Sequence, residues 1–444
     1  MYSWLLRRVL LPLGDYVVGQ RMMHRLSLLE EVQWWPRERL HSYRDQLLRQ
    51  LIGTVYREVP LYRELMDRAR VSPDDIHGAC DLPRLPIVSK DILRAGFPEK
   101  VTRSTGQKTY LSCSSGSTGR PFCVVEDNET AGWYRASFLL ALEWAGWRLG
   151  EPHLQTGMTL KRQQGRRIKD WLLRCHYRSA YDLRDETLDR HLELIEQRNI
   201  QHVWGYPGSL YYLAKRALQR GWNRSLRSVV TWGDMLYPRY RSVIEQAFGV
   251  RVTDTYGCAE GMQIAAQCEE GVYHIHTLDA VVEFVNEDGV PATSGDRAHL
   301  VVTRLHAGPM PLIRYSVGDI GVQGSNNLCQ CGRGYDTMLS IEGRDTDVVV
   351  TPSGNRLIVH YFTGILEFFS EVDSFQVVQY APDAIALRLV VRQDFSADTA
   401  QRIVDLLKGH GAEDLRIEIE LVDEIPLTPA GKRRFVINQV ARGD

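Results

Sequence analysis

The sequence lacks a long apolar run, a strong net charge and a dense set of cysteines. No segment of the 444 residues is as long and apolar as a membrane-spanning helix. The formal net charge is −1, so the chain as a whole attracts neither nucleic acid nor an anionic membrane. The eight cysteines are sparse and irregularly spaced, which indicates reduced thiols or metal ligands. These absences predict a cytoplasmic protein with no transmembrane segment and no nucleic-acid partner.

Two segments leave a surface role open. The N-terminal stretch MYSWLLRRVLLPLGDYVVG is apolar, but charged residues and a proline interrupt it, and no small-residue cleavage site follows. It is either an amphipathic surface helix that touches a membrane or, as is more common, a helix that packs on its own domain. The basic stretch KRQQGRRIK, residues 161–169, is more typical of a solvated surface loop than of a polyanion site.

The chain also lacks the usual P-loop, which needs Gly, four residues and then Gly-Lys-Ser/Thr. The nearest candidate is LSCSSGSTGRPF, residues 111–122, in which Gly116 and Gly119 are too close together and Arg120-Pro121 replaces Lys-Ser/Thr. Such a segment is either a solvated turn or linker, or a cradle in which backbone amides and hydroxyls hold an anion. If it binds a nucleotide, it does so in another fold.

The pattern of apolar residues predicts at least two domains with an α/β core. Residues 36–57 place Leu40, Leu48 and Leu51 on one helical face, and Pro60 limits that helix. From about residue 110 to 305, helical stretches such as LDRHLELIEQ alternate with strand-like stretches such as LRSVVTW. The last hundred residues read as a small α+β unit, and the polar segment at 342–347 is the expected boundary.

Four further motifs are weak one by one but specific in their order. They are DTYGCAEG at 254–261, IRYSVGDIG at 313–321, IEGRDTD at 341–347 and IPLTPAGKRRF at 425–435. Together with SSGSTG, they resemble the adenylate-forming ligase superfamily, and most closely its phenylacetate–CoA ligase-like branch, which includes capsular-polysaccharide biosynthesis relatives. The resemblance is clearest from about residue 110 to 440, and TVYREVPLYREL at 54–65 also resembles that branch.

The resemblance implies a large N-terminal α/β layered domain, residues 1–343 with 1–100 mainly helical, and a small mobile C-terminal α+β domain, residues 344–444. It implies an enzyme that uses ATP and Mg²⁺ to convert a carboxylic acid into an acyl adenylate and pyrophosphate, and then passes the acyl group to the thiol of CoA. An amine or a carrier protein as acceptor, and a non-catalytic nucleotide-binding or scaffolding protein, are the alternatives. The identity of the acid and the oligomeric state are not readable from the sequence.

The resemblance also assigns roles to single residues. Phosphate contacts fall on Ser114, Ser115, Gly116, Ser117, Thr118 and Gly119. Asp254 matches the acceptor for the adenine amino group, Tyr256 the aromatic that lies against adenine, Asp319 the carboxylate that binds the ribose hydroxyls, and Arg344 an arginine near ribose and phosphate. Glu260 matches the acid that holds Mg²⁺, and Lys432 matches the mobile lysine that reaches the α-phosphate during adenylation. Tyr206 and Gly233 fall near the acyl pocket of relatives.

Two positions depart from the pattern of the family. Many relatives have a lysine after the proline of the phosphate loop, where this chain has Phe122, so neutralisation of the phosphates must come from the metal and from elsewhere. The hinge of relatives often reads Gly-Arg-x-Asp-Asp, which places Thr346 at the usual acid, flanked by Asp345 and Asp347. Which residue acts as the pivot therefore stays open.

A separate set of residues has the chemistry of a zinc site. Cys268 and His274 precede Cys329 and Cys331 in the chain, and thiolate and imidazole are good zinc ligands. His276 is an alternative to His274, and four reduced residues without a metal are the other reading. Some members of the resembled branch carry a structural metal in this region. We therefore expect a structural Zn²⁺ held by Cys268, His274, Cys329 and Cys331.

Overall fold

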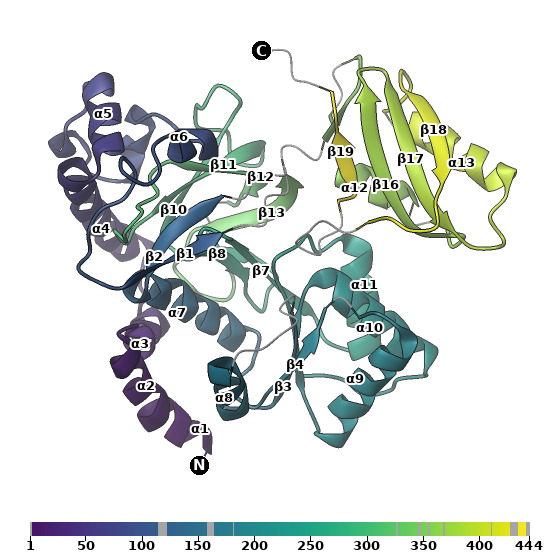
Figure 1. The fold of residues 1–444 in the computed structure, drawn as a ribbon, viewed down its shortest axis with the longest axis horizontal. Coiled ribbons are helices and arrows are strands. Elements are labelled where there is room, and N and C mark those ends of the chain that lie inside the picture. The colour runs from purple at the N-terminus through teal and green to yellow at the C-terminus, as the bar shows by residue number, and fades with distance from the viewer. Residues whose placement is uncertain are drawn as a thin grey trace. The chain divides into compact units, whose positions relative to one another are not determined.

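The computed structural model divides the chain into two compact units (Figure 1). It describes residues 2–113, 122–157, 164–180, 182–325, 327–344, 348–353, 356–366, 369–409, 411–426 and 434–440. The larger unit comprises Met1–Val317 and Gly321–Ser340, and the smaller unit comprises Gly318–Ile320 and Ile341–Asp444. The division falls inside the strand Thr337–Arg344, as does the predicted boundary between residues 343 and 344.

The first hundred residues are mainly helical, as the sequence predicts. The helices are α1 (Tyr2–Leu5), a π-helical turn (Leu6–Leu10), α2 (Leu11–Val18), α3 (Met22–Val32), α4 (Arg37–Glu58), α5 (Pro60–Ala69), two short 3₁₀ helices (Pro73–Asp75 and Ala79–Arg84) and α6 (Lys90–Ala95). Helix α4 confirms the helix predicted over 36–57, and its predicted apolar face is buried at Leu40, Leu48 and Leu51. Pro60 starts α5 at its first turn, where a missing N–H costs nothing. No helix in the described part of the chain is long and apolar enough to cross a membrane.

An eleven-stranded sheet forms the centre of the larger unit, and its strand order is β10-β11-β12-β13-β9-β8-β7-β6-β5-β3-β4. The strands are β3 (His153–Gly157), β4 (Cys175–Ser179), β5 (His202–Gly205), β6 (Ser228–Thr231), β7 (Val252–Cys258), β8 (Met262–Gln267), β9 (Tyr273–Ile275), β10 (Ala280–Val285), β11 (Arg297–Arg304), β12 (Tyr315–Gln323) and β13 (Thr337–Arg344). Strands β3 to β7 pair in parallel, whereas β7 to β9 pair antiparallel.

Helices and a hairpin complete the larger unit. They are α7 (Asn128–Trp144), α8 (Gln164–Leu172), α9 (Asp185–Gln197), α10 (Pro207–Gln219), α11 (Pro238–Phe248) and the hairpin of β1 (Thr109–Cys113) and β2 (Cys123–Asp127). Helices α9, α10 and α11 follow β4, β5 and β6 and lie together beside the parallel strands (Figure 1). Strands alternating with helices give the α/β layering that the sequence predicts.

The smaller unit is α+β, again as predicted. It contains the pair β14 (Val348–Val350) and β15 (Arg356–Ile358), helices α12 (Val359–Leu366) and α13 (Ala397–Lys408), and strands β16 (Val372–Ala381), β17 (Ala384–Val391), β18 (Arg416–Leu421) and β19 (Val436–Asn438). Strands β16 to β19 form a four-stranded sheet in the order β18-β17-β16-β19. Ser396 caps α13 by accepting from the backbone N–H of Thr399, which satisfies one of the donors that a helix start leaves unpaired.

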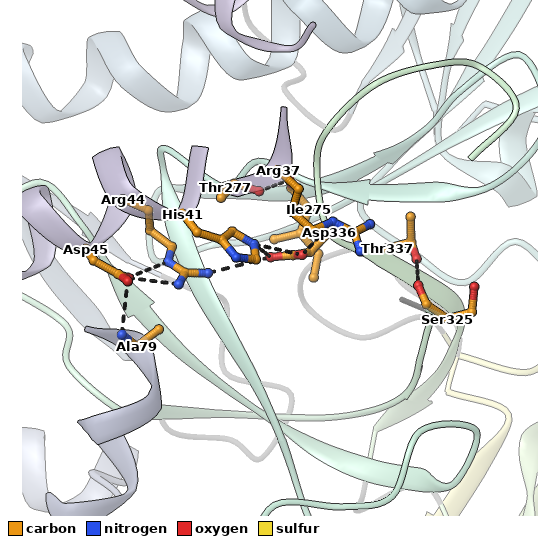
Figure 2. Close-up of polar contacts among 10 residues, drawn as sticks. All are labelled: Arg37, His41, Arg44, Asp45, Ala79, Ile275, Thr277, Ser325, Asp336 and Thr337. Carbon is orange, nitrogen blue, oxygen red and sulfur yellow. Dashed lines mark hydrogen bonds and ion pairs between the residues drawn. The ribbon is translucent and has the colours of Figure 1, made fainter. Parts of the chain in front are cut away.

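An ionic cluster ties α4 to the segment that precedes β13 (Figure 2). His41 Nε2 lies 3.0 Å from both carboxylate oxygens of Asp336. Arg37 Nε and Arg44 Nη1 lie 3.6 and 3.7 Å from the same carboxylate. Burial alone raises the pKa of Asp336, but the hydrogen bond and charge of His41 and the two guanidinium groups outweigh it and hold the pKa below its ordinary value. The charged form of Asp336 therefore stabilises the folded state.

We expect Asp336→Asn to lower the free energy of unfolding of the larger unit by about 1 kcal/mol at neutral pH, because a carboxylate one-third exposed is partly screened by solvent. Since the folded-state pKa is depressed, this stabilisation is present above the ordinary carboxyl pKa of about 3.9 and is lost as the pH falls through the lower folded-state value. Urea unfolding at several pH values measures it. The matched control is Asp296→Asn, at an exposed turn, and a loss that is equal in the two variants would contradict the role of the cluster.

Candidate functional site

The β1–β2 hairpin holds both ends of the loop that the sequence analysis assigns to phosphate. The two strands pair antiparallel from Thr109 opposite Asp127 to Cys113 opposite Cys123. Residues 114–119, the predicted phosphate contacts, lie outside the described residues, so their role stays a prediction. The structure describes only the antiparallel strands on either side of these residues.

Cys123 is disulfide-bonded. The expectation that the cysteines are reduced thiols or metal ligands is therefore wrong for this residue. The strand register brings the backbone of Cys113 opposite Cys123, at the rung next to the loop. Nothing in the sequence indicates this bond at Cys123, because the cysteines of the chain are sparse and irregularly spaced.

Glu126 connects the hairpin to the rest of the larger unit. Its carboxylate is buried and accepts from Arg304 Nη1 on β11 at 2.8 Å, and both side chains are almost fully buried. Burial raises the pKa of Glu126, although the adjacent Arg304 offsets part of this effect. Breaking one partner of such a buried pair leaves an uncompensated charge, which is strongly destabilising. The pair therefore fixes the hairpin on the sheet.

The same carboxylate lies against the turn that carries Glu260. Gly261 has φ of +77°, and a Cβ added there would lie 2.1 Å from Glu126 Oε1. Only glycine avoids both the left-handed strain and this contact. The glycine at the end of CAEG thus lets the turn between β7 and β8 approach β2, and the hairpin and Glu260 become close neighbours.

Glu260 is a buried carboxylate in a polar cluster. Its Oε1 accepts from the hydroxyl of Tyr315 at 2.7 Å and lies 3.5 Å from Lys90 Nζ. Burial alone raises the pKa of Glu260, but the charge of Lys90 and the hydrogen bonds from Tyr315 and Cys258 outweigh it, so the pKa is lowered. An ionised oxygen ligand of this kind suits Mg²⁺, which fits the predicted role of Glu260.

Lys90 is the residue of this cluster that the sequence analysis missed. It begins α6, whose preceding Ser89 caps the helix by accepting from the N–H of Ile92. Phe122, which stands where many relatives have lysine, is buried and stacks on Tyr315 with ring centroids 6.1 Å apart. The only sequence signal for a lysine elsewhere in the site was the absence of lysine from the loop. Nothing near VSKDIL points to Glu260, which lies far along the chain.

Asp254 and Tyr256 lie on β7, next to the same turn. Both are buried, but the Asp254 carboxylate already accepts from the hydroxyls of Thr231 and Tyr273, each at 2.5 Å. Burial raises the pKa of Asp254 to about 6 despite these donors. Contact of Asp254 and Tyr256 with adenine stays a prediction.

The remaining nucleotide residues belong to the smaller unit. Asp319 is half-buried on β12, in the segment Gly318–Ile320. Arg344 ends β13, but its side chain lies outside the described residues, as do Asp345–Asp347 and Lys432. Their roles stay predictions.

The two residues assigned to the acyl pocket are brought together. Tyr206 follows β5 and Gly233 follows β6, and these strands are parallel neighbours, so both residues lie beyond carboxyl ends of the sheet, where open α/β sheets bind ligands. Gly233 has φ of +76°, and a Cβ there would lie 2.8 Å from Cε1 of the Tyr206 ring. Trp232 packs edge-to-face on Phe138 beside them. The apolar setting suits an acyl group.

The four predicted zinc ligands also converge. The ligand atoms of Cys268, His274, Cys329 and Cys331 all lie within 4.8 Å of one another. Cys268 Sγ is 3.8 Å from Cys329 Sγ, and Cys331 Sγ is 3.2 Å from His274 Nε2. His276, the alternative ligand, is fully buried and stacks on Trp144 instead. Two thiols from the loop between β12 and β13, one thiol from the turn after β8 and one imidazole from β9 fit the donor set of tetrahedral zinc.

Gly261→Ala should destabilise the larger unit more than a positive φ alone explains. The left-handed conformation costs an alanine about 1–2 kcal/mol, and the contact with buried, ion-paired Glu126 should raise the total to roughly 3 kcal/mol or more. Gly295→Ala is the matched control, because Gly295 also has positive φ but has no atom within 4 Å of an added Cβ. Urea unfolding measures the free energy of unfolding of both variants. An equal loss in the two would show that the Glu126 side chain can move aside at no cost.

Comparison with known proteins gives relatives over most of the chain. A model of the CapK C-terminal domain matches residues 349–439. A phenylacetate-coenzyme A ligase of Thermus thermophilus is 26% identical over 401 residues, which cover 84% of this chain and 86% of that protein. Protein CapK of Staphylococcus aureus is 24% identical over 421 residues, 90% of each chain.

Solved structures share the fold. A 2-hydroxyisobutyryl-CoA ligase, in the postadenylation state with 2-HIB-AMP, matches with a TM-score of 0.72 at 19% identity and covers 92% of each chain. The matched fold includes the larger α/β unit with a smaller C-terminal unit, as the sequence predicts. These relatives and the shared fold support the resemblance of the chain to the phenylacetate–CoA ligase-like branch of the adenylate-forming ligases.

Proposed function

We propose that the protein is an AMP-forming ligase that activates a carboxylic acid with ATP and transfers the acyl group to the thiol of CoA. The observation that carries this proposal is the cluster of Glu260, Lys90 and Tyr315, one turn away from the hairpin that bears the Ser/Gly-rich loop. An ionised buried carboxylate, a cation and a loop rich in donors are the groups that a triphosphate needs. The named relatives support the same chemistry.

In the first half-reaction, a carboxylate oxygen of the acid attacks the α-phosphorus of ATP. The bond from that phosphorus to the bridging oxygen of the β-phosphate breaks, and pyrophosphate leaves with the bond electrons. Glu260 would hold the Mg²⁺, which supplies charge neutralisation on the phosphate oxygens when bound. Lys90 lies beside Glu260 and supplies a second cation where the loop has Phe122. In the second half-reaction, a thiolate sulfur attacks the acyl carbon and AMP leaves.

Exchange of labelled pyrophosphate into ATP, with a panel of carboxylic acids, tests the proposal. The acid that supports exchange identifies the substrate, and mass spectrometry with CoA, amines or a carrier protein then identifies the acceptor. An amide product without a thioester would favour the amide-forming alternative. Nucleotide binding without exchange for any aryl or alkyl acid would favour a non-catalytic protein. Substitution of Gly233 by Ala should alter the acid preference, since Tyr206 lies against it.

We expect Lys90→Met to lower kcat/KM of the exchange reaction about 100-fold, because the developing phosphate charge loses one preorganised cation. Lys90→Arg should recover part of this loss. Lys100→Met is the matched control, since Lys100 pairs with exposed Glu64 on the surface. If Lys90 only orients Glu260, excess Mg²⁺ should restore the Lys90→Met variant, and a full recovery of that kind would contradict contact with the phosphates.

Lys432 lies outside the described residues, and the proposal assigns it the α-phosphate contact delivered by a mobile smaller unit. Lys432→Ala should slow adenylation by about 100-fold or more and should leave transfer from preformed acyl adenylate much less affected. Single-turnover measurements of the two half-reactions separate these effects. Lys408→Ala, at the end of α13, is the control in the same unit. Equal losses in both half-reactions would rule out the assignment.

A structural Zn²⁺ held by Cys268, His274, Cys329 and Cys331 is part of the proposal. All four side chains would serve as ligands, which leaves no open position for substrate. The metal would join the turn after β8 to the loop between β12 and β13. Metal that binds only the folded chain adds its binding free energy to stability.

We expect one zinc per chain in protein purified without added metal. Cys331→Ser should release the zinc and lower Tm by several degrees, about 2–4 °C for each kcal/mol lost in a unit of this size. Elemental analysis and thermal unfolding provide the two readouts. Cys80→Ser is the matched control, because Cys80 is an exposed free cysteine remote from the cluster in sequence. The zinc proposal would be contradicted if the wild-type protein contained no metal and had the same Tm as the Cys331→Ser variant.

A further inference from the structure

Exposed apolar side chains are concentrated on two helical segments of the larger unit. Within the described part of the chain, twenty large apolar residues are exposed, and nine of them lie on α1–α2 and α8. The nine are Trp4, Leu5, Leu10, Leu13, Tyr16, Val17 and Val18 on Tyr2–Val18, and Ile168 and Trp171 on α8. Single exposed apolar residues are normal, but a contiguous group of them marks an interaction surface.

The two segments are neighbours although about 150 residues separate them in the sequence. The hydroxyl of Tyr2 donates to the backbone carbonyl of Leu172, and the Arg174 guanidinium lies 4.3 Å from the centre of the Tyr2 ring. Leu6 is fully buried and anchors the N-terminal segment in the core. Figure 1 shows α1, α2 and α8 on the same side of the larger unit. We call Tyr2–Val18 together with α8 the N-terminal patch.

Basic residues accompany the apolar ones. Arg8, Arg166 and Arg167 are exposed, and on α8 the two arginines directly precede Ile168 and lie within one and a half turns of Trp171. The acid of the N-terminal segment does not oppose this charge at the surface, because the Asp15 carboxylate is buried and accepts from the backbone N–H of Met23 at 2.8 Å. The exposed ionic groups of the patch are therefore mainly cationic, although the whole chain is nearly neutral.

We propose that the N-terminal patch docks the protein on a lipid bilayer that carries anionic headgroups. Tryptophan and tyrosine place an apolar ring and a polar edge at the boundary between headgroups and acyl chains, and arginines beside them meet the anionic phosphates. Trp171 is 76% exposed and Tyr16 is 87% exposed, so most of each side chain faces water in the free protein. No helix of the described residues crosses a membrane, and docking of this kind lies on the surface.

Flotation of the full-length protein with vesicles tests the proposal. We expect the protein to float with vesicles of phosphatidylcholine and phosphatidylglycerol and to remain about tenfold less bound to phosphatidylcholine alone. Binding should weaken when the salt concentration rises to about 0.5 M, because salt screens the attraction between the arginines and the anionic headgroups. Brominated acyl chains should quench part of the tryptophan fluorescence, and the Trp4→Ser/Trp171→Ser variant should lose that quenching and most of the flotation.

Two further variants keep the test decisive. Arg166→Gln/Arg167→Gln should lose the preference for anionic vesicles while retaining weak binding, and it leaves the apolar residues in place. Val290→Ser/Leu421→Ser removes two exposed apolar side chains elsewhere and should float like the wild type. All variants should retain pyrophosphate exchange, because the patch contains none of the residues assigned to ATP. Absence of flotation at low salt, or wild-type flotation of both patch variants, would overturn the proposal; so would a dimer that the patch variants disrupt without any vesicle binding.

Discussion

The site depends on keeping a negative charge on Glu260 inside the protein. Moving an isolated carboxylate out of water costs several kcal/mol, and such a group normally takes up a proton instead. Here the ammonium of Lys90 and the hydroxyl of Tyr315 converge on one oxygen and lower the pKa of Glu260. Burial then becomes an advantage, because an ionised ligand with little water around it attracts a divalent cation more strongly.

The charge could not be held there without the packing around it. Tyr315 is itself fully buried, and Phe122 stacks on it from the first residues after the Ser/Gly-rich loop. Glu126, on β2 shortly after Phe122, carries a second buried carboxylate that Arg304 neutralises, and Gly261 leaves room for it. The two buried acids therefore differ in their partners: Glu126 is paired with Arg304 within the fold, whereas Glu260 keeps its charge beside Lys90 at the candidate site.

The helices, strands and α/β layering were easier to predict from the sequence than the cluster of Glu260, Lys90 and Tyr315. Helix 36–57, the α/β core and the small α+β unit follow from local periodicity, which a single sequence displays. Convergence of Cys268, His274, Cys329 and Cys331 was also predictable, because thiols and imidazole are rare enough to stand out. Lys90 was not, since a lysine at the start of a short helix usually faces water, and only the tertiary fold brings it to Glu260. The disulfide at Cys123 was hidden for the same reason, because the partner of a cysteine is set by the tertiary fold.

Two clusters of side chains in the larger unit hold the chain segment that leads to the smaller unit. The ionic cluster of Asp336 and the Cys/His group both fasten the segment between β12 and β13, one from α4 and the other from the turn after β8. This segment leads directly into β13, where the smaller unit begins. If the smaller unit changes position as proposed above, it needs a rigid starting point, because such motion is useful only when it is confined to a few backbone torsions. The N-terminal patch draws all its residues from the larger unit as well. Docking through the patch would therefore hold the larger unit at a lipid surface and use no residue of the smaller unit, to which the proposed α-phosphate contact of Lys432 belongs.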